Sequence, residues 1–283
     1  MEMKTQKLRI KSYAKINLFL DVLRKREDGF HDIRSIFSEI ELFDKINFIL
    51  TKKDDVSILT NKDFVSVKNN LIYRVAIIIK NKYNVSSGVK VELEKNIPIA
   101  AGLGGGSSNA AATIIALSQL WELNLSKKEM HAIASELGSD INFFLEGECQ
   151  MGVGRGEQVS PLPGINLDHI FLVNPGFAIS SKEAYQAVTP NNEPHKGWQN
   201  LLYSSNSRYC FNALEKEICH LYPQIKEIID YLKNNGADKA ILSGSGATVI
   251  AFCPDANTAR KFADFFSAKN YWSYITKTKR STR

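Results

Sequence analysis

The stretch from Gly102 to Asn109 has the residue types and spacing of a phosphate-binding loop. Four glycines and two serines fill its first seven positions, and an alanine-rich apolar run follows. A helix N-terminus leaves backbone N–H groups unpaired and carries partial positive charge, so it attracts anions. Glycines before it let the backbone approach a phosphate because no Cβ intervenes. The stretch therefore indicates phosphate binding. A tight connection that uses glycine only for positive φ is the alternative.

Two familiar phosphate loops do not match this spacing. A Walker A loop requires a lysine after its last glycine, but Ser107 follows Gly106. The dinucleotide fingerprint beginning at Gly102 places Ser107 where its third glycine should stand, so it does not match either. The metalloprotease and nucleophile-elbow motifs are also absent.

Further polar residues stand at positions suited to chemistry. Lys15 and Asn17 are two residues apart in an expected strand, so both side chains point to one side. Asp140 follows the helix-stopping Gly138, and from spacing alone it is an N-cap candidate for the next segment. Local patterns leave both a structural and a catalytic role open for each.

The elements around the loop follow from periodicity. Residues 89–94 alternate apolar and charged side chains, which predicts a half-buried strand. Residues 110–121 predict a helix buried on several sides, with Ser107, Ser108 or Asn109 as its N-cap. The order is therefore strand, glycine loop, helix.

Other segments of the first half are equally clear. The motif SKKE at 126–129 is a capping box that opens a second helix ending at Gly138. A helix is expected from about Leu71, and the N-terminal segments KSYAKINLFLDVL and IRSIFSEIELFDKINFIL predict strands. This half of the chain is mixed α and β.

The pattern restarts after a glycine-rich stretch. We expect a strand at HIFLVNPG, a helix beginning at Pro223 and stopping at Gly236, and two strands joined by the turn SGSGAT. A helix over 257–269 and the strand YWSYIT complete the chain. A second domain is expected to begin near residue 157.

Composition excludes several classes of protein. The chain has 283 residues, 44% hydrophobic and 23% charged, with no apolar run long enough for a membrane helix and no signal-peptide core, so a cytoplasmic protein without membrane association is expected. The four cysteines lack zinc-site spacing. The net charge of +6 owes much to five basic and no acidic residues over 269–283, which favours a solvated surface strand and frayed terminus over nucleic-acid binding.

Four stretches, in order along nearly the whole chain, carry a family resemblance. PIAAGLGGGSSNAAA resembles the phosphate loop of the GHMP kinases, which include galactokinase, homoserine kinase and mevalonate kinase. The stretches AKINLFLDV with DGFHDI, LGSDINFF and LSGSGAT resemble one branch of that family, the kinases of the non-mevalonate isoprenoid (MEP) pathway that act on a cytidine diphosphate methylerythritol.

The resemblance implies an α+β, two-domain GHMP kinase fold. Residues 1–156 would form the N-terminal nucleotide-binding domain with a ribosomal-protein-S5-like domain, and residues 157–283 a C-terminal ferredoxin-like α/β domain contributing to the substrate site. It implies ATP and Mg²⁺ as cofactors, a small-molecule alcohol as acceptor and no nucleic acid, with unknown metal ligands. It leaves monomer and homodimer open.

The resemblance also assigns roles to residues. Lys15 and Asp140 match the catalytic pair, with Asp140 as general base or orienting group and Lys15 stabilising charge. The nucleotide-binding positions are Pro98, Ile99, Ala100, Ala101, Gly102, Leu103, Gly104, Gly105, Gly106, Ser107, Ser108 and Asn109, with Asn70 and Lys95 nearby. The Ser107 hydroxyl is a candidate contact to phosphate or Mg²⁺.

Substrate-side positions follow in the same way. Asn17 would reach the same pocket as Lys15. Phe30 and His31 fall where the family recognises cytosine, and Phe30 replaces the more usual tyrosine, so one hydroxyl is lost. Ser181 and Tyr185 stand where the family tends to have threonine and phenylalanine, with Tyr185 as a second aromatic face. Gly244, Ser245 and Gly246 resemble the third family motif, a tight turn near the phosphate loop. A plain hairpin turn is the alternative.

Three other functions stay open. Another GHMP kinase, acting on mevalonate, homoserine or a sugar, would not need the DGFH segment because its substrate has no pyrimidine. A non-catalytic ligand sensor would need neither Lys15 nor Asp140. A nucleic-acid-binding protein is suggested only by the positive charge.

Overall fold

The structure is a computed structural model that describes residues 6–62, 66–190 and 195–280. The chain divides into two compact units that are not successive in sequence. Unit 1 comprises Met1–Ala14, Leu42–Ile99 and Gly105–Glu146. Unit 2 comprises Lys15–Glu41, Ala100–Gly104 and Gly147–Arg283. The long strands β1 (Lys7–Lys25) and β2 (His31–Thr51) contribute to both units. The expected division at residue 157 concerns the family domains and stays a prediction.

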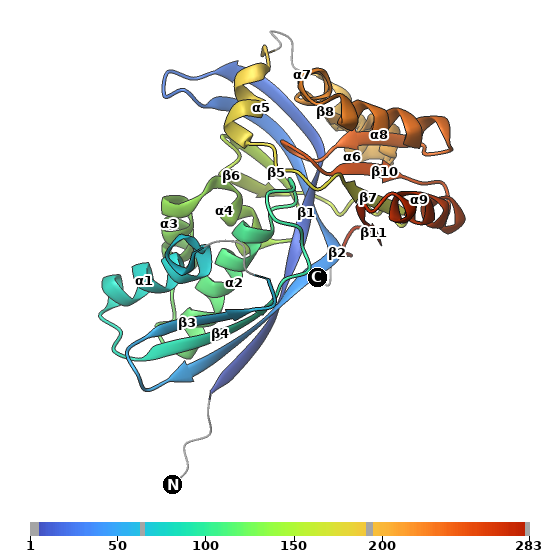
Figure 1. The fold of residues 1–283 in the computed structure, drawn as a ribbon. Coiled ribbons are helices and arrows are strands. Elements are labelled where there is room, and N and C mark those ends of the chain that lie inside the picture. The colour runs from blue at the N-terminus through green and yellow to red at the C-terminus, as the bar shows by residue number, and fades with distance from the viewer. Residues whose placement is uncertain (1–5, 63–65, 191–194, 281–283) are drawn as a thin grey trace. The chain divides into compact units, whose positions relative to one another are not determined.

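Unit 1 is a sheet covered by helices on one face. Its strands run in the order β3 (Val56–Thr60), β4 (Gly88–Glu94), β2, β1, with β4 antiparallel to β2 and parallel to β3. The 3-10 helix η1 (Val67–Asn69) precedes the helices α1 (Leu71–Tyr83), α2 (Gly105–Leu120), α3 (Lys127–Leu137) and α4 (Ser139–Glu146). Figure 1 shows these helices on the same side of β3 and β4.

The local signals in unit 1 explain its elements. The alternation over 89–94 becomes strand β4, with Val89, Val91 and Leu93 buried. The helix α2 is built largely of small residues and is buried around most of its circumference, as its composition predicts. The predicted capping box forms at the start of α3, where the side chains of Ser126 and Glu129 bond each other's backbone N–H groups.

Unit 2 extends β1 and β2 with further strands and adds a second sheet. Strand β5 (Cys149–Gly154) pairs with β2 and with β6 (Gln158–Pro161), while β8 (Phe211–Asn212) pairs with β1 in parallel. The second sheet has the order β11 (Trp272–Thr276), β7 (Ile170–Asn174), β10 (Val249–Phe252), β9 (Lys239–Leu242), antiparallel throughout. The expected strands and turn of this half are confirmed.

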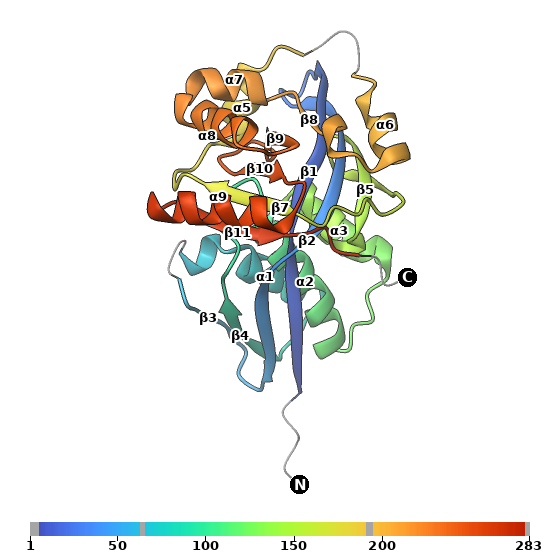
Figure 2. The ribbon, with the colours of Figure 1, turned by 90° about the vertical axis from the view of Figure 1, so that its right-hand side faces the viewer.

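The helices of unit 2 close its core. They are α5 (Ser181–Ala187), α6 (Gly197–Ser204), η2 (Ser207–Tyr209), α7 (Glu215–Leu221), α8 (Pro223–Asn234) and α9 (Ala256–Ala268). Pro223 opens α8, as predicted. Ile225, Ile228, Ile229 and Leu232 of α8 and Phe262 and Phe266 of α9 join the sheet residues in one buried cluster. Figure 2 shows α9 lying across this sheet.

The basic C-terminal segment is more ordered than its composition suggests. Strand β11 lies near the surface, as expected, but the residues after it bond to β2. Glu41 donates its backbone N–H to the carbonyl of Lys277, and the Lys279 ammonium lies 2.7 Å from the Glu39 carboxylate. The prediction of a frayed terminus is therefore wrong for Lys277–Lys279. Residues 281–283 lie outside the described ranges.

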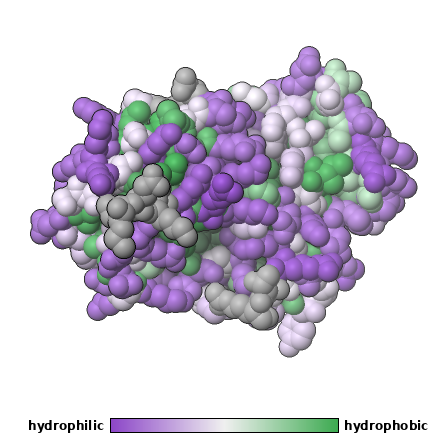
Figure 3. Space-filling view, turned by 90° about the horizontal axis from the view of Figure 1, so that it is seen from below, coloured by the Kyte–Doolittle hydropathy of each residue, from purple (hydrophilic) through white to green (hydrophobic). Residues whose placement is uncertain are grey.

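The surface is mainly hydrophilic on the face drawn in Figure 3, where hydrophobic residues form small separate patches. None of the helices in the described ranges has the length and apolar character of a membrane-spanning segment. The cysteines are unpaired, and Cys149, Cys210 and Cys253 are buried.

Candidate functional site

The glycine loop changes backbone conformation abruptly where α2 begins. Ala100, Gly102 and Gly104 have φ values of 50°, 75° and 68°, and the helix starts immediately afterwards at Gly105. The prediction that Ser107, Ser108 or Asn109 is the N-cap is therefore wrong, because all three lie inside the helix. At the start of α2, Gly106 is exposed and Ser107 half-buried, whereas Gly105 is buried. The first N–H groups of a helix have no acceptor within the helix, and an anion site uses such groups.

Ser108 and Asn109 serve tertiary contacts instead of capping. Their side chains are buried, and Ser108 Oγ lies 2.6 Å from the hydroxyl of Ser12. Asn109 donates its side-chain amide to Ser12 Oγ and to Asp44 Oδ2, each at 2.9 Å. These contacts fasten the first turns of α2 to strands β1 and β2.

Asp44 is the centre of the network at the base of the loop in unit 1. Its carboxylate accepts the backbone N–H groups of Asn96 and Ile97 at 2.7 and 2.9 Å, besides the amide of Asn109. It also pairs with the ammonium of Lys95, and both side chains are almost completely buried. The chain entering the loop and the helix leaving it are thus held by one carboxylate.

Sequence reasoning missed Asp44, although a signal exists. Its neighbours Leu42, Ile46 and Phe48 share the buried face of β2, so Asp44 occupies an apolar phase of the alternating pattern. A charged residue at such a position needs buried partners.

Two predicted nucleotide-binding residues already have structural partners. Lys95 bonds Asp44, and burial lowers the pKa of its ammonium while the Asp44 charge opposes that shift. Asn70 caps α1 by accepting the backbone N–H of Ile72 at 3.0 Å. Lys95 thus belongs to the network around Asp44, and Asn70 belongs to the start of α1. Direct contact of either residue with a nucleotide stays a prediction.

The remaining loop positions differ in exposure. Ile99 and Ala100 are exposed and Pro98 is half-buried, whereas Ala101 and Leu103 are buried. Asp140 lies half-buried in the first turn of α4, within unit 1. Asp140 is a residue of the helix itself. The alternative that it is the N-cap before this helix is therefore wrong.

Unit 2 brings Lys15 and Asn17 together as the strand periodicity predicts. The ammonium of Lys15 donates to Asn17 Oδ1 at 2.8 Å, and the Asn17 amide donates to Ser35 Oγ at 2.8 Å. Both side chains are buried, with Lys15 5% exposed. The backbone N–H of Lys15 also donates to the carbonyl of Leu103, so the strand carrying Lys15 holds the first half of the glycine loop.

The turn over 243–246 joins the antiparallel strands β9 and β10, so it is a hairpin turn, and it also lies against the glycine loop. Ser243 Oγ donates to the carbonyl of Gly102 at 3.2 Å. A Cβ on Gly102 would lie 2.2 Å from the carbonyl oxygen of Ser243, so only glycine fits there. Ser245 Oγ lies 2.9 Å from the hydroxyl of Ser181.

An aromatic cluster lies at the end of β2 in unit 2. The rings of His31 and Tyr185 stack with centroids 5.7 Å apart and an interplanar angle of 25°. Burial, followed by the charge of Lys25, lowers the pKa of His31 and favours the neutral ring. Phe30 is 54% exposed, and the guanidinium of Arg155 lies 4.9 Å from its ring centroid. Aromatic rings can stack on a planar heterocycle, and the nitrogens of a neutral histidine can hydrogen-bond its polar edge.

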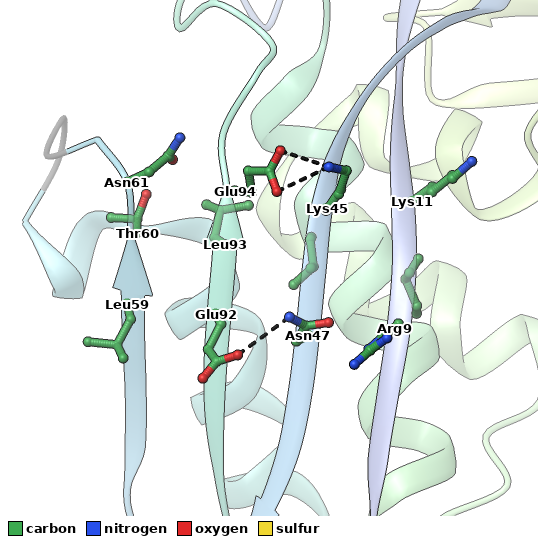
Figure 4. Close-up of a pocket in the computed structure, with 12 residues that line it drawn as sticks. Arg9, Lys11, Lys45, Asn47, Leu59, Thr60, Asn61, Glu92, Leu93 and Glu94 are labelled. Atoms are coloured by element: carbon green, nitrogen blue, oxygen red, sulfur yellow. Dashed lines mark hydrogen bonds and ion pairs between the residues drawn. The ribbon is translucent and has the colours of Figure 1, made fainter.

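The open face of the sheet in unit 1 holds a groove of about 730 Å³ that contains none of the predicted site residues. Figure 4 shows its side chains pointing away from the helices, with Lys45 bonded to Glu94 and Asn47 to Glu92. The remaining cations on this face, Arg9 and Lys11, come from β1. Lys45 and Glu94 in this groove are paired with each other, so these charges are already satisfied within the protein. We therefore place the candidate site at the glycine loop and not in this groove.

Comparison with known proteins shows the family to which the chain belongs. The GHMP kinases N terminal domain matches residues 70–148, which include the glycine loop and Asp140, and the GHMP kinases C terminal matches residues 192–271. A 4-diphosphocytidyl-2-C-methyl-D-erythritol kinase from Caldanaerobacter subterraneus subsp. tengcongensis is 43% identical over 88% of this chain and 89% of its own length. The chain belongs to the GHMP kinases, in the family of this relative.

Other GHMP kinases are similar to this chain over nearly its full length. A Thermodesulfovibrio yellowstonii protein of the same name is 38% identical over 96% of this chain and 98% of its own. The crystal structure of a 4-(cytidine 5'-diphospho)-2C-methyl-D-erythritol kinase superposes with a TM-score of 0.81 at 28% identity, covering 97% of this chain and 100% of that one. L. major mevalonate kinase, with a TM-score of 0.71 at 15% identity, covering 100% of this chain and 99% of that one, shares the fold. The two-domain GHMP kinase fold expected from the sequence is confirmed.

Proposed function

We propose that this chain transfers the γ-phosphoryl group of ATP to the 2-hydroxyl of 4-diphosphocytidyl-2-C-methyl-D-erythritol. The observation that carries the proposal is the full-length similarity to kinases of that name, including the 43% identical relative. Within unit 2, polar contacts link Lys15 to Asn17 and Ser181 to Ser245, and Tyr185 of the same helix as Ser181 stacks on His31. The residues that the proposal assigns to the acceptor are Asn17, Phe30, His31, Ser181 and Tyr185.

The acceptor's cytosine would lie at the aromatic cluster. Tyr185 and Phe30 offer ring faces, and the neutral His31 offers one donor and one acceptor to the base edge. Ser181, four residues before Tyr185 and on the same side of α5, would bind the part of the substrate that follows the base. Phe30 contributes stacking alone because it has no hydroxyl.

Phosphoryl transfer requires an aligned hydroxyl, a receiver for its proton and neutralised phosphate charge. The hydroxyl oxygen of the acceptor attacks the γ-phosphorus, the bond to the bridging oxygen breaks, and ADP leaves with that electron pair. Asp140 takes or orients the hydroxyl proton, and Lys15 stabilises the negative charge on the transferring group. The N–H groups at the start of α2 hold the nucleotide phosphates.

Mg²⁺ is the proposed metal, and it would neutralise charge on the nucleotide phosphates. The described ranges contain no cluster of three His, Cys, Asp or Glu side chains able to hold a metal ion. Magnesium in such enzymes is usually held by one or two protein oxygens together with substrate phosphates and water. The half-buried Ser107, in the first turn of α2, fits that sparse ligation.

We also propose the domain boundaries and the location in the cell that the sequence predicts. Residues 1–156 are the ATP-binding domain and residues 157–283 the domain that contributes to the acceptor site. The protein works in the cytoplasm on a small molecule, without nucleic acid or membrane.

The deciding experiment measures ADP release with ATP and Mg²⁺ across a panel of acceptors. The panel holds the cytidine diphosphate methylerythritol, methylerythritol phosphate, mevalonate, homoserine and galactose. Release with the cytidine compound alone supports the proposal. Release with another acceptor keeps the kinase and replaces the substrate, and no release with any acceptor favours a ligand sensor on the same fold.

A further inference from the structure

Asn212 lies directly behind the turn over 243–246, in unit 2, and no motif in the sequence marks it. Its side chain is 4% exposed. Its amide donates to the carbonyls of Leu242 and Gly244, each at 2.8 Å, and its Oδ1 accepts the backbone N–H of Leu214 at 2.9 Å. Both ends of this side-chain amide are therefore used, with one bond to the end of β9 and one to the turn.

A second side chain holds the same strand end. Glu215, three residues after Asn212, accepts the backbone N–H of Leu242 at 2.9 Å. Residue Leu242 is thus held through its carbonyl by Asn212 and through its N–H by Glu215. Burial raises the pKa of Glu215, whose side chain is half-buried.

These contacts exceed what a hairpin needs. Strands β9 and β10 already pair from Lys239 to Leu242, and Ser243 donates its N–H to the carbonyl of Thr248 at 2.8 Å. The hairpin is closed by its own backbone, so the bonds from Asn212 fix the direction in which the turn projects from it. Strand β8 anchors Asn212, which pairs in register with Leu20 of β1.

The turn projects onto the residues assigned to phosphoryl transfer. Ser243 bonds the carbonyl of Gly102 in the glycine loop. A Cβ on Gly244 would lie 3.1 Å from Oδ1 of Asn17, the atom that accepts the Lys15 ammonium. A displacement of the turn would therefore move both the loop carbonyl and the side chain that orients Lys15.

We propose that Asn212 is a positioning residue for phosphoryl transfer, acting through the turn over 243–246 on Gly102 and on the Asn17 and Lys15 pair. The inference rests on the proposed kinase function. Small misplacements of reacting groups reduce turnover strongly, up to about 100-fold for a shift of about 1 Å. The side chain of Asn212 is buried and bonds Leu242, Gly244 and Leu214, so in this proposal it acts on the reaction through the turn.

The test compares Asn212→Asp, which keeps the acceptor for Leu214 and removes both donors, with Ser243→Ala, which removes the bond to Gly102. Asn206→Asp is the matched control, because Asn206 caps η2 with its Oδ1 and contacts no site segment. The measurements are the thermal midpoint, the Kd of the ATP analogue AMPPNP, and kcat per nucleotide-binding site.

We expect Asn212→Asp to lower kcat per site by at least about tenfold and Ser243→Ala by at least about threefold, with the control unchanged. Because both act through one turn, the double variant should match Asn212→Asp alone within about twofold. Effects that multiply, or an Asn212→Asp protein with kcat and Kd both unchanged, would overturn the proposal. If Asn212→Asp does not fold, Ser243→Ala decides, and an unchanged kcat in that variant overturns it.

Failure of the proposed substrate is distinguishable from failure of this inference. AMPPNP affinity does not depend on the acceptor, and the variants can be assayed with whichever acceptor the wild-type protein uses. A protein inactive toward the cytidine compound, yet with AMPPNP binding weakened at least about fivefold by Asn212→Asp and not by Asn206→Asp, refutes the substrate and supports the positioning role.

Discussion

The side-chain amide of Asn109 donates to the carboxylate of Asp44 at 2.9 Å, between residues 65 positions apart. The same carboxylate holds Lys95 and the two backbone N–H groups that follow it. The segment before the glycine loop and the helix after it are therefore both bonded to the buried carboxylate of Asp44. This closed base lets a loop with several glycines keep a defined shape, because its ends cannot separate.

Removing that anion should destabilise the fold. We expect Asp44→Ala to lower the free energy of unfolding by about 3–5 kcal/mol, since it leaves the Lys95 ammonium and the amide of Asn109 buried without their acceptor. Urea denaturation measures the change. The matched control is Lys45→Ala, which breaks the exposed pair with Glu94 and should cost at most about 1 kcal/mol. Equal effects in the two variants would contradict the assigned role of Asp44.

Asp140→Asn should nearly abolish turnover while leaving nucleotide binding and thermal stability close to wild type. The amide keeps the size of the side chain but cannot accept the hydroxyl proton, and loss of a general base typically costs about 10²–10⁴ in rate. Single-turnover kinetics and AMPPNP titration measure the two properties. Asp230→Asn, at a surface pair with Lys226, is the control. A lowered thermal midpoint with normal kcat would show that Asp140 serves the helix start alone.

Gly105→Val should weaken ATP binding for a steric reason. A Cβ at Gly105 would lie 2.8 Å from both Ile97 Cγ2 and Lys95 Nζ, so the start of α2 must shift away from the buried network. Gly105 lies in the helix and is not among the glycines with positive φ, so the expected effect of valine is steric and owes nothing to a lost positive φ. Nucleotide titration measures the affinity. Gly106→Ala is the stability control, because the nearest atom to its Cβ would be Leu71 Cδ1 at 3.7 Å. Wild-type ATP affinity in Gly105→Val would contradict the role of this helix start.

Tyr185→Ala should raise the KM for the cytidine substrate by about 5- to 100-fold and leave the KM for ATP unchanged. Loss of one aromatic stacking partner costs about 1–3 kcal/mol of base binding. Steady-state kinetics with each substrate varied in turn measures the difference. Tyr203→Ala is the control, because Tyr203 is 95% exposed. An equal rise in both KM values would point to a general loss of structure.

Stability should fall in acid partly because of His31. Its pKa is lowered from 6.5 by burial, so between the folded and unfolded pKa values the unfolded chain binds more protons. The contribution is complete above about pH 6.5 and is lost as the pH falls through the lowered folded pKa. Thermal midpoints from pH 7.5 to pH 5 should therefore decline less steeply in His31→Gln than in wild type. Parallel curves would contradict this assignment.

Most elements were predictable because their signals are local. The alternation over 89–94, the capping box at Ser126 and the proline that opens α8 each act within a few residues. The residue pattern alone placed the glycine loop between a strand and a helix and placed Lys15 on a strand, and the structure confirms both. The expected helix start lay three to five residues too late. Serine and asparagine favour caps in general, but here the side chains of Ser108 and Asn109 bond Ser12 and Asp44.

The sequence by itself determined the order of elements, the glycine loop between a strand and a helix and the side-by-side placement of Lys15 and Asn17, because periodicity and backbone preference act locally. Only the tertiary structure decided that Asp44 holds both ends of the loop and that Asn212 holds the turn over 243–246. These contacts join residues 30 to 65 positions apart. Buried polar groups must find hydrogen-bond partners, and which partners they find depends on the packing of the whole unit.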